Sequence, residues 1–306
     1  AVDGTFTLAP HGTGAVTIVN DAGLTLAAST MGGTFSGTAT AGNITDTGAL
    51  AITGTTTLVT SANDATITLN TSTNEFDGDV DLSTQGTAGH VNLLQGTRWL
   101  RFATSEVRGN LTVTAGNGST IRQSGVLTVD GTTNINANNG TNNILLNTQE
   151  NVLTGTVTMN GHNVKLINAR AVDLGTVNAR ALIITARDAI TQSGVITTNG
   201  DSNITAQNVA GDTKYDVTLE NTSNDFTGYL KLTAADARIK DIDSLELHDS
   251  TVSGDYTLTA GGAVTDVGDL DIEGTTTISA SGFNVTLDST GNDFTGAVEV
   301  VGAAVV

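Results

Sequence analysis

The sequence contains no cysteine and a single proline, Pro10, among 306 residues. Without cysteine no disulfide can hold the chain, so packing and backbone hydrogen bonds must do so. Proline cannot donate to a β-ladder, so its scarcity suits a chain of paired strands. No run approaches the roughly 18 apolar residues that span a bilayer. The first residues also lack the basic and apolar regions of a signal peptide.

Positive charge and aromatic side chains are also scarce. Lys and Arg total 12 against 31 Asp and Glu, which gives a net charge of −19 and a pI near 4.2. Nucleic-acid binding needs clustered Lys and Arg, so we expect no nucleic-acid partner. The acidic surface could recruit divalent cations such as calcium non-specifically, and we expect no cofactor. With 4% aromatic residues, the core must be narrow and filled by Val, Ile, Leu and Ala.

Two short phrases recur in the same phase along the whole chain. The first, N-x-(F/L)-(T/D)-G, begins at Asn74, Asn151, Asn224 and Asn292 and closes on Gly78, Gly155, Gly228 and Gly296. The second begins at Ile44, Ile121, Ile190 and Val264 and shares the glycines Gly48, Gly125, Gly194 and Gly268. A fixed period of about 70 residues predicts a stack of similar units.

We therefore expect one continuous repeat segment over residues 1–306, as a piece of a longer array. The predicted repeats are a partial one at 1–40, complete ones at 41–114, 115–185 and 186–259, and a partial one at 260–306.

Each repeat breaks into short runs in which Val, Ile or Leu alternates with Thr or Asn, as in Leu111–Ala115. This alternation predicts strands with one dry and one wet face. Gly and Asn separate the runs, for example at Gly116–Gly118 and Gly131, where we expect corners with positive φ.

Antiparallel sandwiches and a parallel β-helix both fit such strands. The short spacing and the lack of proline-containing linkers favour an all-β parallel β-helix, or solenoid, with about three coils of 20–25 residues per repeat. Inward-pointing residues should then stack at equivalent levels; they include Phe76, Leu153, Phe226 and Phe294, and Leu50, Leu127, Ile196 and Leu270.

The segments Ala189–Ile196, Ser223–Gly228 and Leu111–Gly116 resemble repeats of filamentous-haemagglutinin-like giant exoproteins of Gram-negative bacteria. That group includes two-partner-secreted adhesins and contact-dependent inhibition stalks. The resemblance implies a right-handed β-helical shaft, exported through an outer-membrane secretion partner to the extracellular space or cell surface. It also implies attachment to a host or neighbouring cell or to polysaccharide. Other copies of the shaft, associated in fibres, are a further candidate partner that the sequence leaves open.

The enzymatic alternative is a polysaccharide lyase or hydrolase on a β-helix, which needs paired carboxylates or calcium-binding acids. Acidic residues do cluster at Asp77–Asp81, but without the further glycine and distant glutamate of a calcium loop. No Ser-His-Asp arrangement is indicated. We therefore predict no catalytic residues, no metal site and no enzyme activity.

One segment departs from the repeat. Residues 99–102 read Trp-Leu-Arg-Phe where other repeats carry Ala-Val-Asp-Leu or Ser-Leu-Glu-Leu. Leu100 and Phe102 should point inward, which turns Trp99 and Arg101 outward with Arg98 beside them. An exposed tryptophan with arginines is suited to stack on a sugar or to bind a protein. Trp99 covering a neighbouring loop is the structural alternative.

Overall fold

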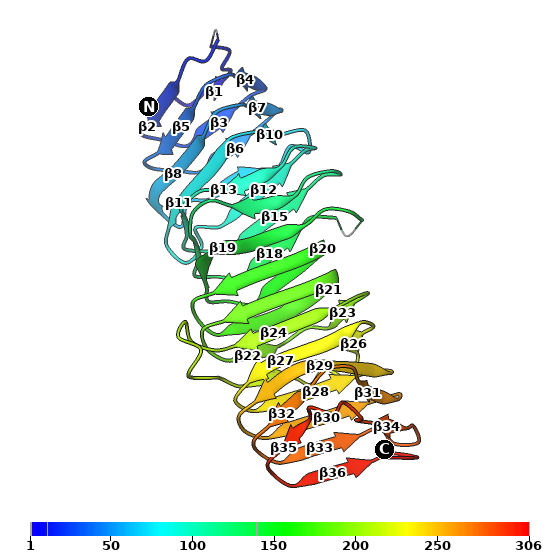
Figure 1. Cartoon of the computed structure of the whole chain (residues 1–306). Coiled ribbons are helices and arrows are strands. Elements are labelled where there is room, and N and C mark those ends of the chain that lie inside the picture. Colours follow the sequence, from blue (N-terminus) through cyan, green and yellow to red (C-terminus); the bar gives the residue numbers. More distant parts are fainter. Residues whose placement is uncertain (1, 11, 139, 306) are drawn as a thin grey trace. The chain divides into compact units, whose positions relative to one another are not determined.

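A computed structural model describes residues 2–10, 12–138 and 140–305 of the chain, which forms two compact units, 1–162 and 163–306. The described residues contain strands and turns but no helix, and hence no helix that could cross a membrane. Within each unit successive strands stack as the chain winds (Figure 1). The named strands pair in parallel, which confirms the predicted all-β parallel β-solenoid.

The strands are short, as the alternating runs predict. Those of the first unit are β1 (Thr5–Phe6), β2 (Val16–Asn20), β3 (Leu24–Leu26), β4 (Ser29–Met31), β5 (Phe35–Ala39), β6 (Ile44–Asp46), β7 (Leu50–Ile52), β8 (Thr56–Asn63), β9 (Ile67–Leu69), β10 (Glu75–Phe76), β11 (Asp79–Gln85), β12 (Val91–Gln95), β13 (Leu100–Phe102), β14 (Ser105–Val107), β15 (Leu111–Ala115), β16 (Ile121–Gln123), β17 (Leu127–Val129), β18 (Thr133–Asn136) and β19 (Ile144–Leu153).

Strand β20 (Val157–Asn168) contains the division between the units. The remaining strands are β21 (Val172–Ala186), β22 (Ile190–Gln192), β23 (Ile196–Thr198), β24 (Ser202–Ala206), β25 (Val217–Leu219), β26 (Asp225–Phe226), β27 (Tyr229–Ala234), β28 (Ala237–Asp241), β29 (Leu245–Val252), β30 (Tyr256–Ala260), β31 (Val264–Asp266), β32 (Leu270–Ile272), β33 (Thr276–Ser279), β34 (Val285–Thr286), β35 (Asp293–Phe294) and β36 (Val298–Val301).

The strand register gives the length of a coil. Val91 pairs with Leu111, Leu111 with Thr133 and Thr133 with Val157, so each of these residues lies one coil after the one before it. The coils are close to one another in length without being identical. The three coils from Val91 to Val157 span 66 residues (157 − 91), fewer than the 77 between the repeated glycines Gly78 and Gly155 (155 − 78). The predicted coil length of 20–25 residues is therefore confirmed for this part of the chain, whereas the sequence repeat is longer than the three coils predicted for it.

The inward columns are aliphatic and aromatic. Phe76 stacks in register on Ile52, as Leu153 does on Val129, and Phe226 lies at the same level of its repeat. These inward positions are fully buried, as predicted, and so are Leu50, Leu127, Ile196 and Leu270.

Phe294 differs from the residues at the same position of the three earlier repeats, because its side chain is only partly buried. It pairs with Ile272 on one side, and among the described residues no strand pairs with β35 on the other. A residue in such a stack is covered from both sides only when coils lie above and below it. Phe294 therefore keeps the predicted inward register on Ile272, and its partial exposure reflects that, within the described part of the chain, β35 is paired on one side only.

The repeated glycines are explained by close backbone approach. A Cβ added at Gly48 would lie 2.7 Å from the backbone nitrogen of Ala28 in the previous coil, and Gly125, Gly194 and Gly268 face a backbone nitrogen in the same way. None of these four has a positive φ. Positive φ does occur at Gly118, as predicted, but not at Gly131, where a Cβ would instead collide with the coil beneath.

A buried asparagine side chain ties the two recurring phrases together. The Oδ1 atoms of Asn74, Asn151, Asn224 and Asn292 accept the backbone N–H of Leu50, Leu127, Ile196 and Leu270, respectively, at 2.8–3.0 Å. Their Nδ2 atoms donate to the third residue of the second phrase, which is Asp46, Gln123, Gln192 or Asp266, at 2.6–3.0 Å. The phrases recur in one phase because each asparagine bonds across a coil boundary.

Replacing this asparagine should destabilise its unit. In Asn224→Ala the Ile196 N–H loses its side-chain acceptor inside the core, and the Gln192 side chain and the Leu219 carbonyl oxygen each lose a hydrogen-bond partner. Each unsatisfied buried group costs about 1–3 kcal/mol, so we expect the free energy of unfolding to fall by about 2–4 kcal/mol. Urea denaturation measures the change. Asn284→Ala is the control, because Asn284 is exposed and should change stability by less than about 0.5 kcal/mol. Equal effects of the two substitutions would contradict this role.

Candidate functional site

Trp99 lies at the surface of the first unit, immediately before β13. Its side chain is 57% exposed, whereas Leu100 and Phe102 are fully buried. The Arg101 side chain is also more than half exposed. The predicted inward and outward orientations at residues 99–102 are therefore confirmed.

The loop that carries Trp99 is fixed by hydrogen bonds to Glu75 in the previous coil. The Glu75 carboxylate accepts the backbone N–H of Thr97 at 2.8 Å and that of Arg98 at 3.0 Å. From inside, the Gln95 side chain donates to the Arg98 carbonyl oxygen at 3.0 Å. These bonds hold the backbone beside Trp99 in one conformation, which lowers the entropic cost of binding at this surface.

The register of β11, β13 and β16 brings a third arginine to the tryptophan. Arg101 pairs with Asp79 of β11 on one side and with Arg122 of β16 on the other. The Arg122 guanidinium carbon lies 3.7 Å from the centre of the Trp99 ring, a cation–π contact. The four residues Arg98, Trp99, Arg101 and Arg122 form what we call the Trp99 patch.

Carboxylates border the patch and partly neutralise it. The Arg98 Nε lies 3.4 Å from Asp77 Oδ1, and Arg101 bonds directly to Asp79. Asp79 also accepts a hydrogen bond from Ser124 Oγ at 2.5 Å. The side chains of Arg98 and Arg101 remain more than half exposed, so they keep donors that face solvent. Arg122 Nε is buried and has no hydrogen-bond partner among the described residues.

Two shallow cavities flank the patch. One, of about 340 Å³, is lined by Asp77, Thr97, Arg98 and Trp99. The other, of about 420 Å³, is lined by Arg101, Arg122, Gln123, Leu145, Asn147 and Thr148. An aromatic ring beside guanidinium donors suits a planar or ring-shaped ligand that carries negative charge, such as a uronic acid or an acidic protein segment.

The three aspartates of the acidic run at Asp77–Asp81 have different surroundings. Asp77 and Asp79 pair with arginines, whereas burial raises the pKa of Asp81. Across residues 2–10, 12–138 and 140–305, no group of three or more His, Cys, Asp or Glu side chains is placed to hold a metal ion.

Sequence reasoning identified Arg98, Trp99 and Arg101 but missed Arg122. The only signal was that Arg101 and Arg122 are separated along the chain by the length of one coil, as their pairing shows. Because coils vary in length, that spacing becomes informative only when the register is known.

Comparison with known proteins gives one result. A family model described as repeats of unknown function matches residues 13–83, 88–160, 161–233 and 234–301. No curated protein and no solved structure matches the chain.

The contact between Arg122 and Trp99 should be visible in fluorescence, because Trp99 is the only tryptophan. In Arg122→Ala one face of the indole loses its cover, so quenching by acrylamide should increase. Stability should fall by only about 0.5–1 kcal/mol, as for an exposed cation–π pair. Arg108→Ala is the control, since Arg108 pairs with Glu106 and Asp130 instead. Identical quenching in wild type and Arg122→Ala would contradict the stacking.

Proposed function

The chain belongs to the DUF5649 family of repeats of unknown function, and from the way these repeats stack we infer that it is a structural shaft segment of a bacterial adhesin. The observation that carries this proposal is the register: within each unit, coil pairs with coil while aliphatic columns fill the interior. In such a stack each coil templates the next, and stability is a sum over neighbours. That construction suits a scaffold that holds other parts at a distance.

The recurring phrases support a finer proposal. They resemble repeats of filamentous-haemagglutinin-like exoproteins, so we place the chain in a right-handed shaft of a two-partner-secreted protein. Its parent would cross the outer membrane through a dedicated partner and stay on the cell surface or in the surrounding matrix. The net charge of −19 favours solubility there and disfavours close lateral packing into fibres unless cations bridge the shafts.

Surface exposure tests this role. Antibodies raised against the chain should label intact cells that produce the parent protein, and external protease should remove the label. A cytoplasmic protein of the same cells, probed in parallel, serves as the control for lysis. Labelling that appears only after the cells are permeabilised would contradict a surface shaft.

The Trp99 patch supports a second role, direct binding of a ligand by the shaft. We propose that it takes an anionic saccharide or an acidic protein segment, with the ligand stacked on the indole face opposite Arg122 and its carboxylate on Arg98 or Arg101. The support is the grouping of the only tryptophan with three arginines on a strongly acidic chain.

Trp99→Ala should keep the fold and lose binding to acidic glycans on an array, by at least about tenfold, since a stacked aromatic anchor contributes about 1–3 kcal/mol. Phe283→Ala is the matched control, because Phe283 is another exposed aromatic side chain, 48% exposed, in the second unit. Unchanged binding of acidic glycans by Trp99→Ala would contradict the proposal that the Trp99 patch binds a ligand.

We propose no catalytic role. At the patch the carboxylates of Asp77 and Asp79 are paired with arginines, and that of Glu75 accepts the backbone N–H groups of Thr97 and Arg98. Glycoside cleavage needs an acid and a base that are free to exchange protons. Incubation with acidic polysaccharides provides the test. Release of reducing ends or unsaturated sugars would favour the enzymatic alternative over the shaft.

A further inference from the structure

Four buried residues at matching positions of the repeats lie at corners of the solenoid, and three of them are amides while the fourth is an aspartate. Strands β2, β12, β20 and β28 end in Asn20, Gln95, Asn168 and Asp241, which follow one another at intervals of one repeat and are buried. The first three are amides whose side-chain nitrogen donates to a backbone carbonyl oxygen of the following turn, at 2.6–3.2 Å. Asn20 donates to Gly23, Gln95 donates to Arg98, and Asn168 donates to both Arg170 and Ala171. The amide closes the corner from inside.

Asp241 can fill only half of this role. Its Oδ1 accepts the Phe226 backbone N–H at 2.9 Å, as Gln95 accepts that of Phe76. A carboxylate has no donor for the turn, and Asp241 Oδ2 is buried without a hydrogen-bond partner among the described residues. The residue is only 5% exposed. A buried carboxylate oxygen without a donor is costly, so this corner is incomplete where the other three are closed.

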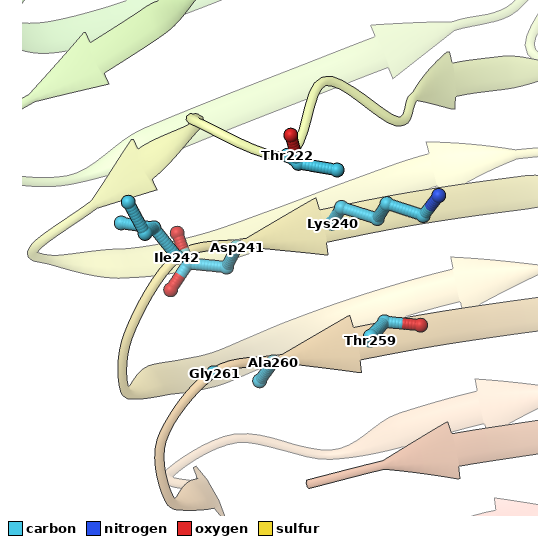
Figure 2. A pocket seen from close by; sticks show the side chains of 7 residues that line it. All are labelled: Thr222, Lys240, Asp241, Ile242, Thr259, Ala260 and Gly261. Atoms are coloured by element: carbon cyan, nitrogen blue, oxygen red, sulfur yellow. The ribbon is translucent and has the colours of Figure 1, made fainter.

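The incomplete corner opens onto a pocket of about 220 Å³ in the second unit. Figure 2 shows its lining, which comes from β28, β30 and the neighbouring turns: Thr222, Lys240, Asp241, Ile242, Thr259, Ala260 and Gly261. Ile242 presents an apolar surface there that is 53% exposed, and two threonine hydroxyls add polar contacts. The volume fits a ligand of about the size of a monosaccharide.

The charges around Asp241 select a cationic donor over a neutral one. Burial is the main reason that the pKa of Asp241 rises to about 6. The backbone N–H groups of Phe226 and Asp243 lower this pKa, and the carboxylates of Asp243 and Asp225 raise it. The only cation in the lining is Lys240, whose side chain extends away from the Asp241 carboxylate in Figure 2. The potential at Oδ2 is therefore negative, which favours an ammonium group over a hydroxyl.

We propose that this pocket binds the protonated amine of a small amino sugar. The ammonium donates to Asp241 Oδ2 and supplies the donor that the other corners carry in their amides. The C–H face of the sugar ring packs on Ile242, and its hydroxyls bond to Thr222 and Thr259. This site lies in a different unit from the Trp99 patch and does not depend on the shaft role, so either can fail without the other.

Calorimetric titration of the whole chain at about pH 7 tests the proposal. Glucosamine should bind, whereas glucose and N-acetylglucosamine, which lack the ammonium, should bind at least about tenfold more weakly. A glucosamine trimer distinguishes the source: binding of the trimer alone would support the site and assign it to a polymer. Binding of neither glucosamine nor its trimer, or equal binding of glucose, would overturn the proposal.

Asp241→Asn is the decisive variant, because the equivalent corners show that an amide folds well there. It should keep the strand signature in circular dichroism and lose glucosamine binding by at least about tenfold. Asp243→Asn, at an exposed neighbour, should reduce binding much less. Undiminished binding by Asp241→Asn would overturn the assignment.

Wild-type binding should also depend on pH in a defined direction. The folded protein holds the Asp241 proton below about pH 6, and a protonated carboxyl does not attract an ammonium. Glucosamine affinity should therefore rise between about pH 5 and about pH 7 as Asp241 ionises. An affinity that is constant across this range would overturn the role of the carboxylate without relying on any variant.

Discussion

The structure depends on a buried side-chain amide that bonds from one coil to the next. An asparagine can accept a backbone N–H with one atom and donate with the other, which neither aspartate nor leucine can do. At Asn74, Asn151 and Asn224 both functions are used inside the core, where an unmet polar group costs most. Because one partner is a backbone amide and the other a side chain of the second phrase, this bond fixes both phrases at once. The sequence repeat is the interval at which that arrangement recurs.

With that constraint met, the remaining positions divide into two kinds. Inward columns and stacked glycines are fixed by contact with the neighbouring coils, so little besides aliphatic residues or glycine is accommodated there. Outward positions meet no such demand. The two candidate sites arise where the repeat pattern is broken. Trp99 replaces a small residue at an outward position just before a strand, and Asp241 replaces an amide at a corner.

The sequence alone predicts most of the fold and less of the sites. Period, strand alternation and inward columns follow from residue type and spacing, and the orientation of Trp99 follows from strict alternation. The sequence predicts a positive φ at Gly131, whereas the structure requires glycine there because the neighbouring coil lies too close for a Cβ. The residues around a turn do not reveal such contact between coils. Arg122 and Asp241 required the register: which residue lies above another depends on coil lengths that differ from coil to coil. The residues that bond to each asparagine belong to the second recurring phrase. The sequence shows that this phrase repeats, but only the stacking of the coils shows that its residues bond to the asparagine.

Hydrogen exchange tests the central claim most directly. The amides of Leu127 and Ile196 donate to the side chains of Asn151 and Asn224 of the following coil. If the account is right, they exchange as slowly as ladder amides of the same coils, because they open only when the coils separate. Fast exchange at these two amides, with slow exchange in the neighbouring ladders, would show that the asparagines do not hold the coils together.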